Sequence, residues 1–158
     1  MGYYKLDQDK AFLISQKALV VEANKLLVLK TPPDINNGQS KWELPGGLLE
    51  LDESLSSGLL REVREETGLL IAVGRTFAVW DYWSQGFEFR DGRVLDVKII
   101  GMAFHCQRIA GDVQISDEHC QFGWMTNAEL MELDFSLNSA FAVHKYLAEK
   151  LVITDDRP

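Results

Sequence analysis

Apolar residues are distributed along the chain in runs that predict a series of β-strands. Residues 11–23 and 25–30 are rich in Ile, Leu and Val, and because Asn24 separates them we expect a hairpin. Two longer runs of the same kind, 69–83 and 93–109, flank the sequence RDGR, whose Asp-Gly pair favours a tight reversal. We therefore expect these two runs to form long antiparallel strands.

Helical spacing begins soon after the sequence WELPGG, which we expect to end a short strand in a tight turn. From Asp52 or Glu53 to Thr67, apolar residues recur at intervals of three to five, and Gly68 supplies a C-terminal stop. This segment therefore predicts an amphipathic helix.

The C-terminal part of the chain predicts one more strand, at 121–125, and two helices. Thr126 and Glu129 fit the S/T-x-x-E capping box, which predicts a short helix ending near Asp134. A final amphipathic helix is expected over about 138–151. Strands interleaved with a few helices and tight antiparallel reversals predict an α/β fold with a mixed β-sheet flanked by helices.

Length and composition predict a single globular domain over residues 1–158, with 46% hydrophobic and 25% charged residues. The apolar runs fall short of the roughly 20 residues that span a bilayer, so we expect no membrane segment. The N-terminus lacks the pattern of a secretory signal, and Cys106 and Cys120 have neither a disulfide-framework nor a zinc spacing. We therefore expect a cytoplasmic protein.

The formal net charge of −8 predicts a surface that repels the nucleic-acid backbone, and no basic stripe compensates. We expect no nucleic-acid polymer as a partner. An acidic protein still handles an anionic small molecule if divalent cations lie between the two.

Three glutamates, Glu62, Glu65 and Glu66, project together from the predicted helix because positions i, i+3 and i+4 share one face. Two of them border the apolar stripe, where like charges raise one another's pKa and cost stability unless a cation joins them. Either Arg61 and Arg64 neutralise the cluster as ion pairs on a solvated face, or a hard divalent cation, Mg²⁺ or Mn²⁺, binds the carboxylate oxygens.

The segment that contains these glutamates, GLLELDESLSSGLLREVREETGL at residues 47–69, resembles the Nudix box at every specified position. The preceding LPGG and Glu50 also resemble the usual lead-in to that box. The resemblance identifies the chain as a member of the Nudix hydrolases, which hydrolyse a nucleoside diphosphate linked to another group. It implies an α/β/α sandwich around a mixed sheet, and Mg²⁺, or Mn²⁺, as the cofactor.

The resemblance also implies roles for single residues. The implied metal ligands are Glu62, Glu65, Glu66 and the carbonyl of Gly46. Catalysis is implied for Glu62, our first choice as general base, for Glu65, and for Arg61, which would orient a glutamate by ion pairing. Structural roles within the box are implied for Gly47, Glu53 and Gly68.

A further carboxylate, Glu118, stands in a loop before the strand that carries Trp124. In many Nudix proteins a glutamate at such a place binds metal or acts as base, which implies a catalytic role here; the alternative is a solvated loop carboxylate. The neighbouring His119 could take a proton near neutral pH.

Candidates for substrate binding are aromatic and arginine side chains, namely Trp42, Trp80, Tyr82, Arg90 and Arg93. The alternative for the aromatic residues is core packing or a homodimer surface. The markers of several Nudix subfamilies are missing after the box, which favours a nucleoside or deoxynucleoside triphosphate as the small-molecule substrate. ADP-ribose or a nucleotide sugar is the alternative substrate, and a non-catalytic nucleotide-binding module is the alternative of another class.

Two residues depart from the usual Nudix pattern. Asp52 stands where the family often has Gly, and we expect it to cap the helix. Gly58 stands where the family often has Ala, and it gives either clearance for a metal or phosphate or close packing on a neighbouring strand.

Overall fold

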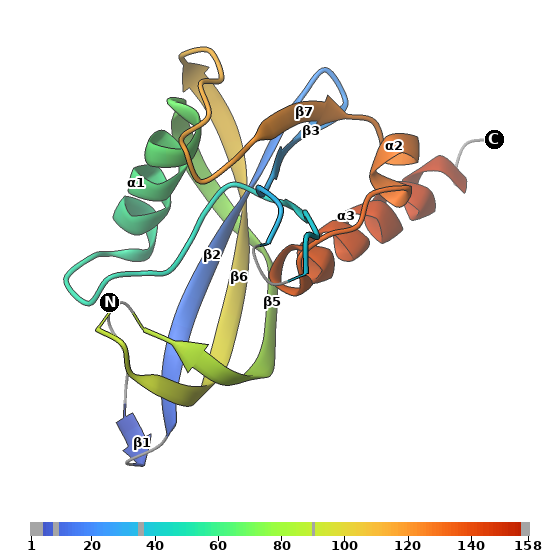
Figure 1. The fold of residues 1–158 in the computed structure, drawn as a ribbon. Helices are drawn as coiled ribbons and strands as arrows, with labels where there is room; N and C mark the ends of the chain where they lie inside the picture. The colour runs from blue at the N-terminus through green and yellow to red at the C-terminus, as the bar shows by residue number, and fades with distance from the viewer. Residues whose placement is uncertain (1–4, 8–9, 35–36, 90, 156–158) are drawn as a thin grey trace.

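The computed structural model describes residues 5–7, 10–34, 37–89 and 91–155. Within them, seven strands form one sheet with the central order β4-β3-β2-β6-β5, while β1 pairs with β2 and β7 pairs with β3 (Figure 1). The strands are β1 (Lys5–Asp7), β2 (Lys10–Glu22), β3 (Lys25–Lys30), β4 (Trp42–Glu43), β5 (Leu70–Glu88), β6 (Val94–Ala110) and β7 (Gln121–Met125).

The sheet is mixed, as the sequence predicted. β5 and β6 are antiparallel, and the expected reversal between them is closed by a hydrogen bond from Phe89 N to Arg93 O of 2.8 Å, with Gly92 at a φ of +80°. β5 runs on to Glu88, five residues beyond the predicted end at Trp83. β2 pairs with β6 in parallel. This parallel pairing holds the centre of the sheet together.

β2 and β3 form the predicted hairpin, with Ala23 and Asn24 both at positive φ in its turn. Only two residue pairs join the strands before they diverge. The segment after β4 takes the open edge of β2, where Gln16 N donates to Gly47 O and Ala18 N donates to Pro45 O, each at 2.8 Å. The backbone of β2 therefore fixes the Gly-Gly turn.

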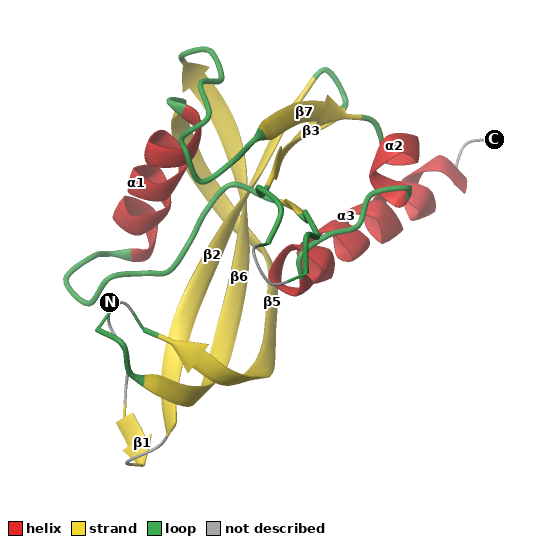
Figure 2. Ribbon diagram, in the orientation of Figure 1, coloured by secondary structure: helices red, strands yellow, loops and turns green. Residues whose placement is uncertain are grey.

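Helices cover both faces of the sheet. α1 (Leu55–Thr67) packs on one face, and α3 (Leu137–Asp155), with the short α2 (Asn127–Met131) beside it, packs on the other (Figure 2). Leu59 and Val63 of α1 are fully buried in one apolar cluster, and Val143 of α3 in another. The α/β/α arrangement is thus confirmed. No helix of the described residues is long and apolar enough to span a membrane.

The start of α1 differs from the expected one. The N-cap is Ser54, whose hydroxyl accepts from Ser57 N while the Ser57 hydroxyl accepts from Ser54 N, so the helix begins at Leu55. Asp52 lies outside this cap, and the expectation that it caps the helix is wrong. Gly68 ends α1 at a φ of +69°, as predicted.

Two further differences concern the ends of the C-terminal helices. α2 ends at Met131, before the predicted Asp134, and α3 extends the predicted helix at both ends. At Gly58, a Cβ atom would lie 2.7 Å from Leu49 Cδ1 and 2.9 Å from Gln16 Oε1. Close packing against Leu49 of the loop before α1 and against Gln16 of β2 therefore accounts for this glycine.

Candidate functional site

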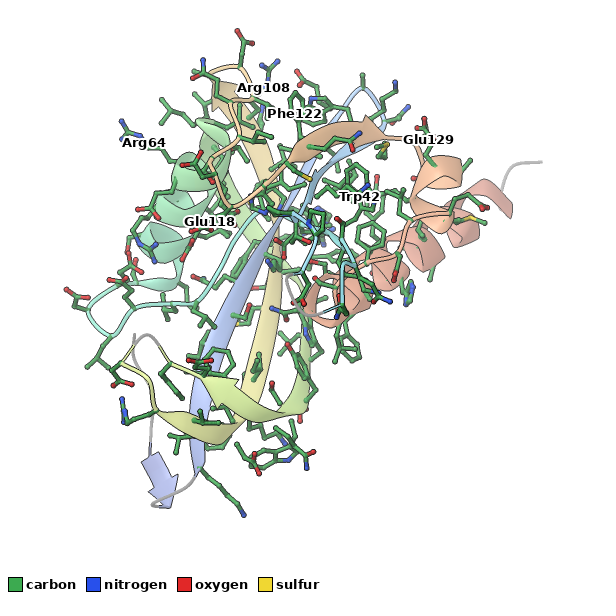
Figure 3. All side chains as sticks on the ribbon, in the orientation of Figure 1. Trp42, Arg64, Arg108, Glu118, Phe122 and Glu129 are labelled. Carbon is green, nitrogen blue, oxygen red and sulfur yellow. The ribbon has the colours of Figure 1, made fainter. Side chains whose placement is uncertain are left out.

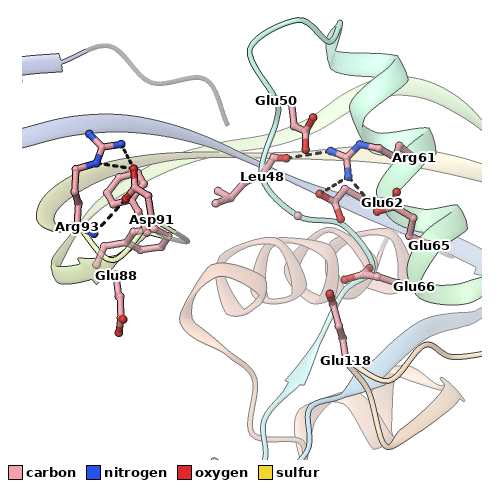
Figure 4. Close-up of a pocket in the computed structure, with 13 residues that line it drawn as sticks. Leu48, Glu50, Arg61, Glu62, Glu65, Glu66, Glu88, Asp91, Arg93 and Glu118 are labelled. Atoms are coloured by element: carbon pink, nitrogen blue, oxygen red, sulfur yellow. Dashed lines mark hydrogen bonds and ion pairs between the residues drawn. The ribbon is translucent and has the colours of Figure 1, made fainter.

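A cavity of about 730 Å³ lies between α1, the Gly-Gly turn, the β5–β6 hairpin and the loop before β7 (Figure 4). Its lining includes the carboxylates of Glu62, Glu65 and Glu66 from α1, and that of Glu118 from the loop. In Figure 4 the carboxylates of Glu66 and Glu118 point toward one another, although the two residues are 52 positions apart in the sequence. The structure thus brings all four predicted carboxylates to one cavity.

Arg61 is the centre of the ion pairs at this site. Its Nε and Nη2 atoms bind the two oxygens of Glu53 at 2.6 and 2.9 Å, and its Nη1 lies 3.0 Å from Glu62 and 3.1 Å from Glu65. The hydrogen bond from Arg61 holds the pKa of Glu53 below its usual value. Glu53 in turn accepts from Glu50 N, so it ties the start of the box to α1.

Glu66 is the most deeply buried of the carboxylates, with 6% of its surface exposed. Its Oε2 accepts a hydrogen bond from Gly46 N at 2.7 Å. Burial raises the pKa of Glu66 to about 7, because an ionised carboxylate loses its hydration there. Burial also raises the pKa of Glu62, and the pairing with Arg61 opposes that rise only in part.

The two glycines of the turn have separate structural reasons. Gly46 has a φ of +125°, and a Cβ atom there would lie 2.2 Å from Gln16 O. A Cβ atom on Gly47 would lie 2.6 to 2.8 Å from the carboxyl group of Glu62. Gly46 therefore lets the turn pack on β2, and Gly47 makes room for the carboxylate of Glu62.

The ligand atoms present at the site are of the type that binds a divalent metal. Among the described residues no three His, Cys, Asp or Glu side chains are arranged to hold one ion together, and Arg61 pairs with both Glu62 and Glu65. Carboxylate oxygens are nevertheless the ligands that Mg²⁺ and Mn²⁺ prefer. A cation at Glu66 would offset the cost of burying its charge. The Gly46 carbonyl, expected as a ligand, accepts a hydrogen bond from Lys17 Nζ at 2.7 Å.

Lys17 and Glu43 belong to this region and were missed in the sequence. His119 Nε2 lies 2.8 Å from Glu43 Oε1, and Lys17 Nζ lies 3.6 Å from Glu43 Oε2. Burial raises the pKa of Glu43, but Lys17 and His119 together hold it below its usual value. One signal was available, since Lys17 is a charged residue inside an apolar run of β2.

The predicted substrate-binding residues are divided between the cavity and the core. Arg93 lines the cavity and pairs with Asp91 at 2.7 Å. Arg90 lies outside the described residues. Trp42 is buried in the core on the α3 side of the sheet. Figure 3 shows it apart from Glu118, which lies beside α1.

Two other predicted aromatics contact α3. Trp80 Nε1 donates to Asn138 Oδ1 at 3.2 Å, and the Tyr82 ring stacks on that of Phe141. Neither belongs to the described lining of the cavity, whose aromatic members are Phe87 and Phe89. The aromatic content of residues 77–93 was visible in the sequence, but which of its rings face the cavity was not.

Comparison with known proteins shows the family to which the chain belongs. The NUDIX domain model matches residues 13–146, and the chain therefore belongs to the Nudix family of hydrolases. A MutT-like protein from Streptomyces ambofaciens is 33% identical over 114 residues, which cover 72% of this chain and 63% of that protein. The nucleoside triphosphatase NudI of Escherichia coli O81 (strain ED1a) is 26% identical over 121 residues, or 75% of this chain and 85% of that protein.

A solved structure is similar over nearly its whole length. The MutT protein from Methanosarcina mazei Go1 has a TM-score of 0.65 and 26% sequence identity, and the alignment covers 92% of this chain and 96% of that one. The likeness extends the family match to the arrangement of the sheet and its helices.

Proposed function

We propose that the protein is a Mg²⁺-dependent pyrophosphohydrolase that cleaves a nucleoside or deoxynucleoside triphosphate. The observation that carries the proposal is the convergence of Glu62, Glu65, Glu66 and Glu118 on one cavity beside Arg61. Relatives named as MutT-like and as a nucleoside triphosphatase support the triphosphate as substrate.

The chemistry requires three things of the site. A phosphoric anhydride resists attack because its oxygens are negative, so the site must neutralise them, hold a water in line and accept a proton from it. Glu62, Glu65 and Glu66 would hold divalent cations between them, and these cations supply the neutralising charge when bound. Arg61 would orient Glu62 and Glu65 through its ion pairs.

The proton from the attacking water would pass to a carboxylate as the new P–O bond forms and the anhydride P–O bond breaks. We favour Glu62 as this base because its carboxylate lines the cavity and burial raises its pKa, whereas the carboxylate of Glu66 is more deeply buried and already accepts a hydrogen bond from Gly46 N. Glu118 faces the same cavity from a separate loop and is the second candidate.

The far end of the cavity would take the nucleoside. In Figure 4 the hairpin with Asp91 and Arg93 lies across the cavity from the α1 carboxylates. Phe87 and Phe89 line that end and supply apolar surface for a base. The acidic end would thus hold the phosphates, and the hairpin end the base and sugar.

The test is a panel of nucleoside triphosphates, deoxynucleoside triphosphates, ADP-ribose and nucleotide sugars, incubated with Mg²⁺ and assayed for released phosphate and pyrophosphate. We expect hydrolysis of at least one triphosphate, and a roughly 10- to 100-fold lower kcat for Glu65→Gln and for Glu118→Gln. Glu149→Gln, on the exposed surface of α3, is the matched control and should retain full activity.

Two results would contradict the proposal. Tight nucleotide binding without hydrolysis of any panel member would indicate a binding module. Unaltered rates in Glu65→Gln or Glu118→Gln would remove that residue from the catalytic set.

A further inference from the structure

Lys17 is a buried charge behind the catalytic cavity. Only 4% of its surface is exposed, and it is not among the described residues that line the cavity. Burying an ammonium group costs several kcal/mol unless it is paired and hydrogen-bonded. Its described partners are the carbonyl of Gly46 at 2.7 Å and the carboxylate of Glu43 at 3.6 Å.

Two connections lead from Lys17 to the cavity, and we call them its two arms. The first arm reaches α1 through Gly46. The carbonyl of Gly46 accepts from Lys17, and its N–H donates to Glu66 Oε2 at 2.7 Å. The same residue packs against Gln16 O so closely that no Cβ atom fits. Lys17 and Glu66 therefore hold the two polar groups of one residue whose position β2 already restricts.

The second arm reaches the loop that carries Glu118. Glu43, paired with Lys17, binds His119 at 2.8 Å, and the side chain of His119 is 1% exposed. On the other side of Glu118, Ser116 N donates to Glu66 O at 3.2 Å. The loop is thus attached to the α1 backbone before Glu118 and to the buried ion pair directly after it.

We infer that Lys17 is a positioning residue for the reaction under Proposed function, on which this inference rests. Through Gly46 and through Glu43–His119, it sets the positions of Glu66 and Glu118 relative to one another. It is a cation shared by both arms, so its removal loosens both sides of the cavity at once. It contacts neither the nucleotide nor the reacting atoms.

The test compares Lys17→Met with Lys98→Met. Lys98 also lies on a strand of the sheet and pairs with a carboxylate, Asp81 at 2.7 Å, but its described side-chain contacts, with Asp81 and Trp83, reach neither Gly46 nor the loop that carries Glu118. Mn²⁺ binding to the nucleotide-free protein is measured by electron paramagnetic resonance, and kcat and KM by triphosphate hydrolysis. Circular dichroism and thermal unfolding establish that each variant is folded.

We expect Lys17→Met to weaken Mn²⁺ binding and to lower kcat, each by roughly 10- to 100-fold, as loss of residues that orient metal ligands does. KM should stay within about twofold of the wild-type value, because Lys17 does not line the cavity. Lys98→Met should match the wild type in Mn²⁺ affinity, kcat and KM. The losses from Lys17→Met and Glu118→Gln should be less than additive, since Lys17 acts partly through Glu118.

A folded Lys17→Met protein with wild-type Mn²⁺ affinity and kcat overturns the inference, and so does strict additivity with Glu118→Gln. Should Lys17→Met not fold, Glu43→Gln breaks the second arm while Lys17 stays on Gly46, and an unchanged kcat overturns the inference. If the wild type binds Mn²⁺ but hydrolyses no nucleotide, the proposed function fails, whereas weaker Mn²⁺ binding by Lys17→Met still supports the positioning role.

Discussion

The burial of Glu66 predicts that the substitution Glu66→Gln stabilises the metal-free protein at high pH. Burial raises the pKa of this carboxyl from 4.5 to about 7. A group whose pKa is higher in the folded state contributes stability below its unfolded pKa and loses it as the pH rises through the folded pKa. The difference between 4.5 and about 7, at about 1.4 kcal/mol for each pKa unit, amounts to about 3 kcal/mol.

Glutamine has nearly the same shape, can accept the hydrogen bond from Gly46 N and does not ionise. Glu66→Gln should therefore equal the wild type near pH 4.5 and exceed its free energy of unfolding by about 3 kcal/mol at pH 8 in EDTA. Urea unfolding followed by circular dichroism at both pH values measures this free energy. Other groups titrate alike in the two proteins, so their contributions cancel in the difference.

Added Mg²⁺ should remove most of this difference in the free energy of unfolding. A ligand that binds only the folded state at 100 times its Kd stabilises it by about 2.7 kcal/mol, and the wild type should gain more than the variant. A variant that is less stable than the wild type at pH 8 in EDTA, or a difference that does not change with pH, would refute the reasoning about Glu66.

Two further substitutions test the site and its helix. Gly47→Ala places a methyl group 2.6 Å from the carboxyl carbon of Glu62, so we expect roughly tenfold weaker Mn²⁺ binding with an unchanged circular dichroism spectrum; unchanged binding would contradict this. Ser54→Ala removes the N-cap of α1 and should cost about 1 kcal/mol, lowering the Tm by about 2 to 4 °C without loss of hydrolysis, and an unchanged Tm by scanning calorimetry would contradict it.

The sequence predicted those parts of the fold that depend on neighbouring residues. α1 was visible from its apolar period and from Gly68, and the β5–β6 reversal from its Asp-Gly pair. The start of α1 was misplaced because Asp52 and Ser54 both suit a cap, and the reciprocal bonds between Ser54 and Ser57 decide for Ser54. A local pattern shows that a cap is near, but not which of two candidates forms it.

The residues of the site also divide into those that the sequence could group and those that only the fold brings together. The three α1 carboxylates share a face because helical geometry requires it, so the sequence was enough to group them. Lys17, Glu43 and the loop histidine come from three separate elements, and only the folded sheet brings them together. Period and propensity give no information on such long-range pairs.

The parallel pairing of β2 with β6 has a consequence for biosynthesis. Each paired residue of β2 meets the residue 86 positions later, from Lys10 with Asp96 to Val20 with Cys106. At about 5 to 20 residues per second, a ribosome needs roughly 4 to 17 s to supply that partner. During this interval the apolar β2 strand of the nascent chain lacks its central neighbour, so this segment is where we expect a chaperone to bind first.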